Sequence, residues 1–319
     1  MTPLVTRTLD EVARHTGLVF RDTRLTGAVE IIQAWLARHA IANPIEIGPG
    51  IAFDALLEQL VVHESYFDRD LEQLRLVDEL VLARLVGTTE PIRLWSAGCA
   101  NGEEPYTLAF MLASRGLLER ATITATDLSA AAVTRARKGH YRPWSVRTTT
   151  DSPAMRYLVR AGTELHVPDS IKRAIRFEIL NLVEDPFPAN QQLIVCRNVL
   201  IYLDPPAIAT VATKLANALA PDGWLFVAPS DARLDPFAPL VATVTDRGVY
   251  YRRGDAVAPI RALPPSLPPA IARVTAARLP PKPLPPPPPL SIAMRVRALA
   301  DRGDHAAARK LLAQAIGAT

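Results

Sequence analysis

The chain has 319 residues, of which 49% are hydrophobic and 21% charged, with a formal net charge of +4. This length allows one sizeable core with an accessory module, and the composition is that of a soluble globular protein. The mild charge, the 6% aromatic content and the lack of a lysine or arginine run argue against a nucleic-acid platform. The most hydrophobic stretch, 193–203, is interrupted by Arg197 and Asn198, which excludes a membrane span. Asp10 and Glu11 stand where a signal peptide needs its apolar core, so we expect a cytoplasmic protein.

Residues 1–86 are predicted to form a small helical N-terminal domain. Apolar residues between Ala28 and Leu36 recur at the spacing of one helix face, and residues 50–86 predict further helices.

From Ile92 onward, short β-rich runs alternate with helical stretches. The predicted strands are 92–97, 121–127, 191–197 and 223–229, and the predicted helices are 103–115, 129–139 and 205–219. This alternation predicts parallel βαβ units and a doubly wound α/β sheet within residues 87–255. Residues 140–176 do not follow the alternation, and we interpret them as an insertion.

Proline dominates residues 256–290, including PPKPLPPPPP at 280–289. Such a tract cannot build a core and predicts an extended linker. Residues 291–319 then predict one helical hairpin, similar in length to a single TPR-like repeat. Because a lone repeat cannot bury its apolar face, it either docks elsewhere or is followed by further repeats.

The loop WSAGCANGEEPYTLA at 95–109 follows the first predicted strand. Gly98 permits a tight turn, and Gly102 lets the backbone approach a ligand before a helix begins. Dinucleotide folds place a pyrophosphate at this helix start, but here Glu103 and Glu104 would repel a phosphate. Carboxylates suit an ammonium, a sulfonium and ribose hydroxyls, which favours S-adenosylmethionine over NAD or ATP. The alternative is a helix start whose acidic residues only complement the helix dipole.

Two other predicted strands also end in polar residues. Asp127 ends the second strand, where an acidic side chain commonly receives ribose hydroxyls, although it could simply cap the next helix. Arg197, Asn198 and Tyr202 follow the third, at the edge where open α/β sheets bind ligands. Polar groups at that depth need partners, so they are either structural donors or site residues.

Six motifs occur in order between about residues 17 and 252. They are VVHESYFDRD (61–70), WSAGCANGEEPYTLA (95–109), TDLS (126–129), Gly139–Tyr141, Asn181–Leu182 and CRNVLIYLD (196–204). Together they resemble the CheR family of chemoreceptor glutamate methyltransferases. The resemblance implies a class I methyltransferase sheet with a small helical N-terminal domain, and it makes 140–176 an inserted β-subdomain that grips a receptor's tail peptide in some members.

The resemblance also implies roles for individual residues. Asp127 should hold the ribose of S-adenosylmethionine, and Glu104 its methionine end. Arg69 should meet the substrate glutamate, and Tyr202 should line the transfer site. The cofactor-binding residues expected in full are Ala97, Gly98, Cys99, Asn101, Glu104, Asp127, Asn181, Leu182, Arg197 and Asn198.

A carboxylate acceptor fits the chemistry of these residues. A glutamate with a pKa near 4.3 is already an anion at neutral pH, so its methylation needs no general base. His63 lacks a second histidine at HExxH spacing, Cys99 and Cys196 lack metal-ligand spacing, and we expect no metal site. Asp68 stands where the family has an aromatic residue, beside Arg69, where its charge could alter the choice of acceptor.

The sequence therefore predicts a protein-glutamate O-methyltransferase with a chemoreceptor-like helical signalling protein as substrate and S-adenosylhomocysteine as product. A further protein partner is expected for the C-terminal repeat. We expect the chain neither to bind nucleic acid nor to insert into a membrane. One alternative is a methyltransferase for RNA or a small molecule, since the fold does not fix the substrate. Another is a regulatory scaffold that binds the cofactor without turnover.

Overall fold

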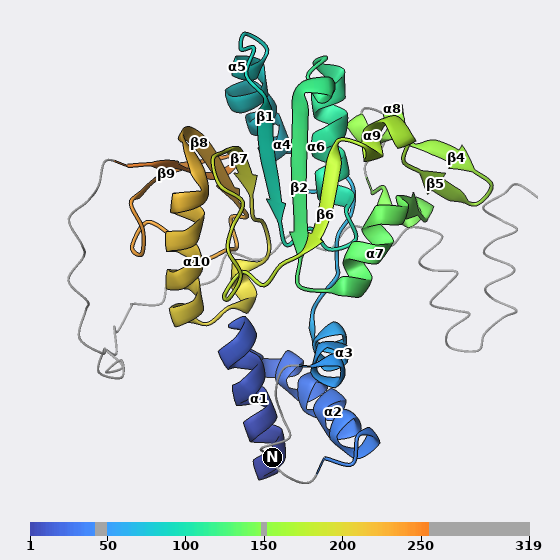
Figure 1. Cartoon of the computed structure of the whole chain (residues 1–319), viewed down its shortest axis with the longest axis vertical. Coiled ribbons are helices and arrows are strands. Elements are labelled where there is room, and N and C mark those ends of the chain that lie inside the picture. Colours follow the sequence, from blue (N-terminus) through green and yellow to red (C-terminus); the bar gives the residue numbers. More distant parts are fainter. Residues whose placement is uncertain (42–49, 148–151, 255–319) are drawn as a thin grey trace, which may run out of the picture. The chain divides into compact units, whose positions relative to one another are not determined.

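The computed structural model describes residues 1–41, 50–147 and 152–254 (Figure 1), all of which belong to one unit, Met1–Leu263. The predicted linker (256–290) and helical hairpin (291–319) lie outside the described residues. Within the described part, no helix combines the length and apolarity needed to cross a bilayer.

The centre is a seven-stranded sheet in the order β6-β2-β1-β7-β8-β10-β9. Its strands are β1 (Ile92–Ala97), β2 (Ala121–Asp127), β6 (Ile175–Ile179), β7 (Gln191–Val195), β8 (Leu219–Val227), β9 (Leu240–Thr245) and β10 (Gly248–Arg253). The first five in this order are parallel, and β10 pairs antiparallel with both β8 and β9. From β1 the chain adds strands toward β6, and from β7 it adds strands toward β9. The adjacent carboxyl ends of β1 and β7 are therefore the switch point where such sheets bind ligands.

Helices cover both faces of the sheet, as predicted for the α/β fold. They are α6 (Glu103–Ser114), α7 (Ala130–Lys138) and α10 (Pro205–Ala218), with short helical turns η3 (Leu118–Arg120) and η5 (Leu200–Tyr202). Neighbouring strand residues enter different cores: Leu94 packs with α6 and α7, whereas Trp95 packs with α10. This is the alternation of side chains expected along a strand buried on both faces.

The N-terminal helices fall into two groups. The first comprises α1 (Pro3–Thr16), α2 (Asp22–Arg38) and α3 (Ile51–Leu60), which lie below the carboxyl ends of the strands in Figure 1. The second is α4 (Leu71–Val77), a π-helical turn η2 (Asp78–Leu82) and α5 (Ala83–Leu85), and its residues share a core with α6. The helices expected within 50–86 therefore divide between the edge of the sheet and one of its faces.

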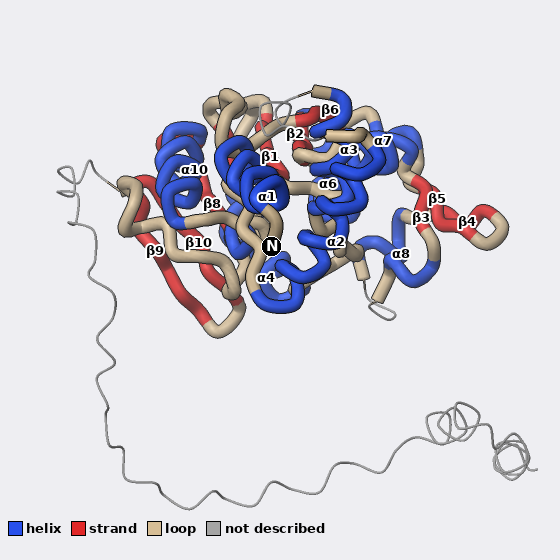
Figure 2. The backbone as a smooth tube through the Cα atoms, turned by 90° about the horizontal axis from the view of Figure 1, so that it is seen from below, coloured by secondary structure: helices blue, strands red, loops and turns tan. Residues whose placement is uncertain are grey.

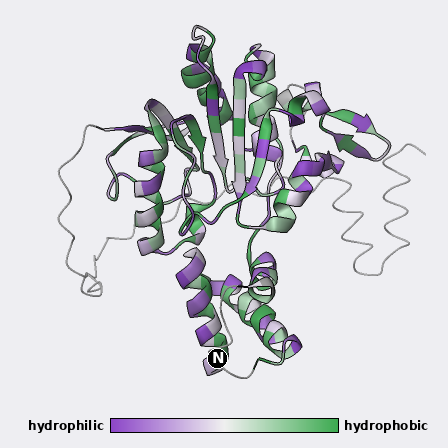
Figure 3. Ribbon diagram, viewed as in Figure 1, coloured by the Kyte–Doolittle hydropathy of each residue, from purple (hydrophilic) through white to green (hydrophobic). Residues whose placement is uncertain are grey.

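Helix α1 has clear start and stop signals. The Thr2 hydroxyl accepts a hydrogen bond from the Val5 amide, and Gly17 ends the helix with φ of +70°. Val5 and Val12 lie seven residues apart on its buried side, whereas the side visible in Figure 3 is largely hydrophilic. The Gly17 carbonyl accepts from the Asp204 amide at 2.8 Å, which fixes the end of α1 beside the loop that follows β7.

The insertion forms a small antiparallel sheet, β3-β5-β4, which is visible at the right of Figure 2. Its elements are β3 (His140–Tyr141), η4 (Pro143–Ser145), α8 (Pro153–Tyr157), β4 (Val159–Ala161), β5 (Glu164–His166) and α9 (Asp169–Lys172).

Several predicted boundaries were wrong. The predicted strand 223–229 corresponds to β8, which spans Leu219–Val227. Residues 175–176 belong to β6, which pairs with β2, and are not part of the insertion. Strand β7 ends at Val195 instead of Arg197, because the chain turns at Asn198, where φ is +57°.

Candidate functional site

A pocket with an empty volume of about 1130 Å³, part of it open to solvent, lies at the switch point of the sheet. One wall comes from the loops that follow β1, β2, β6 and β7, and the other from α1, α2 and residues 61–69. Ten of the twelve residues expected at the site line it. They are Arg69, Gly98, Cys99, Glu104, Asp127, Asn181, Leu182, Arg197, Asn198 and Tyr202.

The other two expected residues, Ala97 and Asn101, do not line the pocket. Ala97 is still within β1 and is fully buried. The Asn101 side chain turns away from the pocket, where it donates to the His63 carbonyl and accepts from the Arg135 guanidinium. It therefore ties the loop to its surroundings.

The loop after β1 is bent sharply around one carbonyl. The amides of Gly98 and Cys99 both donate to the Thr126 carbonyl, at 2.8 and 2.9 Å. Gly98 has φ of +75°, and a Cβ atom there would lie 2.4 Å from Cγ2 of Val199. Only glycine therefore allows the loop to approach the β7 side so closely.

Asp127 fastens this loop to the end of β2. One carboxylate oxygen accepts from the Ala100 amide at 2.8 Å, and the other accepts from the Ser129 amide at 3.0 Å. Burial raises the pKa of Asp127, and the two backbone hydrogen bonds partly oppose that shift. Each oxygen has a further lone pair, so the carboxylate can still receive hydroxyl groups from a ligand.

Glu104 and Arg197 form a buried ion pair beneath the pocket. The Arg197 Nε donates to the Glu104 carboxylate at 2.8 Å, and the side chains are only 3% and 13% exposed. The Ser96 hydroxyl donates to the other Glu104 oxygen, and Arg197 also donates to the Arg69 carbonyl. Arg197 thus joins the end of the sheet to the segment that carries Arg69.

Asn181 and Leu182 hold the loop after β6 against the N-terminal helices. The Asn181 amide nitrogen donates to the His15 carbonyl at 2.6 Å, and its oxygen accepts from the Val183 amide. Lys214 donates to the Leu182 carbonyl from α10. This rim of the pocket is therefore held by hydrogen bonds between side chains and backbone groups, which the sequence did not indicate.

Asn198 has a polar atom available at the pocket. Its backbone amide donates to the Asp231 carboxylate and its side-chain Nδ2 donates to the Ser230 hydroxyl, whereas its buried Oδ1 has no hydrogen-bond partner among the described residues. Asp231, which sequence reasoning missed, also accepts from the amides of Ala228 and Ile201. Burial raises the pKa of Asp231, and these hydrogen bonds oppose that shift.

The opposite wall carries two arginines and two aromatic rings. The Arg24 guanidinium lies 4.4 Å from the centre of the Tyr202 ring, and Arg69 lies 5.6 Å from that of Tyr66. Arg69 also donates to the Glu64 carbonyl at 3.1 Å. Arg24 was not predicted, because its place at the pocket depends on the docking of α2 beside Tyr202.

Asp68 and Glu103 do not line the pocket. Asp68 is 2% exposed and accepts a hydrogen bond from the Ser152 hydroxyl, and its side chain is not part of the pocket that Arg69 lines. Glu103 is 1% exposed, and burial raises its pKa. Of the two acidic residues at the start of α6, only Glu104 faces the pocket.

The described residues that line the pocket include no histidine or lysine, and their carboxylates are those of Glu64, Glu104 and Asp127. Burial raises the pKa of the Cys99 thiol well above its usual range, and Glu104 is held by Arg197. The arrangement therefore suits a reaction whose nucleophile arrives already ionised.

These features also fit S-adenosylmethionine. The Gly98 loop supplies close backbone contact. The Asp127 carboxylate and the Asn198 Oδ1, which has no partner within the described part of the chain, supply acceptors for hydroxyl or amino groups. The carboxylates of Asp127 and Glu104 disfavour a phosphorylated ligand.

The chain matches known proteins over the part that contains most of the pocket residues. Residues 63–235 match the family described as "CheR methyltransferase, SAM binding domain". The chemotaxis protein methyltransferase of Borreliella burgdorferi is 30% identical over 55% of this chain and 66% of its own length. Chemotaxis protein methyltransferase 2 of Vibrio cholerae is 30% identical over 70% of this chain and 83% of its own length.

Among solved structures, the chain is similar to the TehB-like SAM-dependent methyltransferase of Corynebacterium glutamicum. The match covers 72% of this chain and 98% of the Corynebacterium glutamicum chain, with 14% identity and a TM-score of 0.37. From the family match and the relatives above, the chain belongs to the CheR methyltransferase family and is an S-adenosylmethionine-dependent methyltransferase.

Proposed function

We propose that the chain transfers a methyl group from S-adenosylmethionine to glutamate side chains of a chemoreceptor or a related signalling protein. The observation that carries this proposal is the pocket wall that combines Arg24 and Arg69 with no histidine or lysine among its described residues. Two guanidinium groups attract an anionic acceptor, and a carboxylate needs no base to become a nucleophile. The relatives named chemotaxis protein methyltransferase support the choice of substrate.

Five residues of the pocket bind S-adenosylmethionine in this proposal. Asp127 receives the ribose hydroxyls, and Glu104 receives the ammonium of the methionine end. Asn181 and Leu182 flank the adenine, and Asn198 accepts from the cofactor through its Oδ1. Arg197 supports these contacts by fixing the orientation of Glu104, to which it is bonded at 2.8 Å.

On the acceptor side, Arg69 orients the substrate carboxylate and Tyr202 lines the transfer site. Arg69 already donates to the Glu64 carbonyl, so only part of its guanidinium is available to the acceptor. This suits a positioning role, because an anion held by the whole guanidinium fork would be a weaker nucleophile. Arg24, which lies against the Tyr202 ring, adds positive charge at the same wall.

The reaction joins two opposite charges. S-adenosylmethionine supplies a methyl group on a positively charged sulfur. A carboxylate oxygen of the acceptor forms the new C–O bond while the C–S bond breaks and its electron pair passes to sulfur. Both charges are neutralised, so alignment and exclusion of water supply most of the rate enhancement. The N-terminal helices would provide both by covering the carboxyl end of the sheet.

Radiolabelled methyl donor, incubated with the purified chain and a fractionated cell extract, separates this proposal from its alternatives. The proposal predicts label in a membrane-receptor fraction. Label in RNA or in small molecules would contradict it, and cofactor binding without transfer to any fraction would favour the scaffold. The catalytically weakened Arg69→Ala variant, run in parallel, identifies label that depends on this pocket.

A further inference from the structure

The small sheet of the insertion carries two histidines and a glutamate on one face, outside the methyl-transfer pocket. His140 on β3 is the direct cross-strand partner of His166 on β5, and Glu164 lies two residues before His166. Because side chains alternate along a strand, all three project from the same side of the sheet. Tyr141 and Leu165, the neighbours in sequence, are each 6% exposed and face the core.

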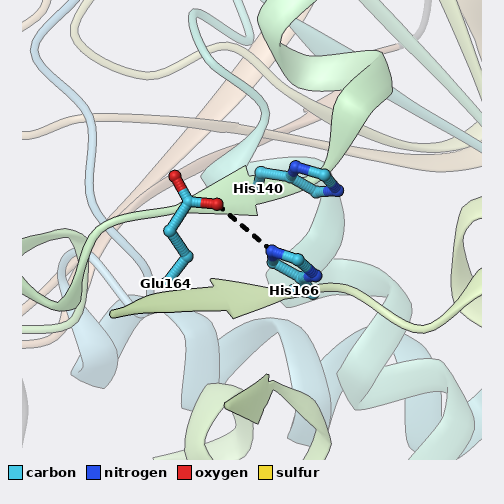
Figure 4. A group of neighbouring side chains, drawn as sticks. All are labelled: His140, Glu164 and His166. Atoms are coloured by element: carbon cyan, nitrogen blue, oxygen red, sulfur yellow. Dashed lines mark hydrogen bonds and ion pairs between the residues drawn. The ribbon is translucent and has the colours of Figure 1, made fainter. Parts of the chain in front are cut away.

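The three side chains are close enough to share one ion. One ligand atom from each lies within 4.8 Å of the others, and Figure 4 shows the carboxylate and both imidazoles on one side of the strands. The His166 Nε2 and a Glu164 oxygen are 3.3 Å apart. With metal–ligand bonds of about 2.1 Å, that separation corresponds to an angle of about 104° at the metal, near the tetrahedral value.

We propose that His140, Glu164 and His166 bind a first-row transition metal ion, Zn²⁺. Two imidazoles and one carboxylate are a donor set that suits zinc, and three protein ligands leave a fourth position for water or another ligand. The imidazole rings now stack with centres 3.9 Å apart and planes 6° from parallel. Binding therefore requires the rings to turn about χ2, a broad torsion, until a nitrogen of each faces the carboxylate.

The consequence of binding is local to the insertion. His140 directly follows Gly139, the residue that ends α7, whereas His166 is the last residue of β5, which comes last of the three strands along the chain. An ion held by both would fasten β5 to the end of α7. It would stabilise the folded insertion by mass action without touching the methyl-donor pocket.

The test is a titration of the full chain, purified without a polyhistidine tag, with Zn²⁺ in competition with a chromophoric chelator. We expect a single zinc ion per chain, and the variants His140→Gln, His166→Gln and Glu164→Gln should each weaken it by about tenfold or more. His39→Gln, which removes an exposed histidine outside the trio, should bind zinc as the wild type does. All four variants should bind S-adenosylmethionine normally.

A second readout is the thermal midpoint, which zinc should raise in the wild type and in His39→Gln but not in the trio variants. Failure of the wild type to bind zinc, or unchanged affinity in His140→Gln and His166→Gln, would overturn the proposal. Stacked histidines that serve only as a cross-strand pair would give that result.

Discussion

Replacing Gly98 with alanine tests whether the loop after β1 depends on its close contact with Val199. Two costs are expected. The left-handed backbone, with φ of +75°, costs a residue with a Cβ atom about 1 kcal/mol. The new Cβ would also lie 2.4 Å from Cγ2 of Val199, where carbon atoms prefer about 3.5–4.0 Å, and relieving such overpacking costs about 2 kcal/mol. Gly98→Ala should therefore lower the free energy of unfolding by about 3 kcal/mol.

The matched control is Gly116→Ala. Gly116 has nearly the same φ, +69°, but a Cβ atom there meets nothing within 4 Å. It should lose only about 1 kcal/mol. In a Val199→Ala background, Gly98→Ala should also cost only about 1 kcal/mol, because the Val199 methyl groups are gone.

Urea denaturation of the single and double variants gives these free energies, and calorimetry gives the affinity for S-adenosylmethionine, which should fall in Gly98→Ala alone among the two glycine variants. Equal costs for Gly98→Ala and Gly116→Ala, or no relief from Val199→Ala, would refute the reasoning.

Three further predictions concern the charged residues around the pocket. Asp127→Ala should weaken S-adenosylmethionine binding measured by calorimetry, whereas Arg69→Ala should leave the cofactor Kd nearly unchanged and lower the rate of methyl transfer. Equal effects of the two substitutions on cofactor binding would show that these roles are misassigned. In urea denaturation, Arg197→Met should cost about 3 kcal/mol because it leaves the Glu104 carboxylate buried without its partner, and a loss below about 1 kcal/mol would mean that the pair is well solvated. Burial raises the pKa of Glu103, so the stability that the protonated Glu103 contributes is present below the unfolded-state pKa and is lost as pH rises through the folded-state pKa. Relative to Glu103→Gln, the wild type should therefore gain free energy of unfolding as pH falls from 7 toward about 4. A constant difference between the two proteins across that range would contradict the shift.

The residues on strand ends were predictable from the sequence because a parallel sheet brings its carboxyl ends to one edge. Asp127 ends β2, Asn198 lies just after β7 and Glu104 lies in the first turn of the helix that follows β1, and each lines the pocket. Their hydrogen-bond partners were not predictable, because those partners come from distant segments. Asp231, for example, reaches the Asn198 amide from 33 residues away.

Residues of the N-terminal helices were harder to assign for the same reason. Arg24 acquires its place only when α2 docks beside Tyr202. Glu58 on α3 accepts from the Ala131 amide and the Ser129 hydroxyl at the start of α7, close to Asp127. Nothing local to Glu58 distinguishes it from a solvated helix charge. The hairpin of β9 and β10 was also missed, because the βαβ rhythm that marked the other strands ends before it.

The nature of the bond that receives the methyl group tests the proposed acceptor most directly. Purified receptor, labelled by the chain with tritiated methyl donor, is treated with mild alkali, and the volatile methanol released is counted. A glutamate ester predicts release of nearly all the label as methanol, and little label should be incorporated by Arg69→Ala. Label that withstands alkali would place the methyl group on nitrogen, sulfur or carbon and would contradict transfer to a carboxylate.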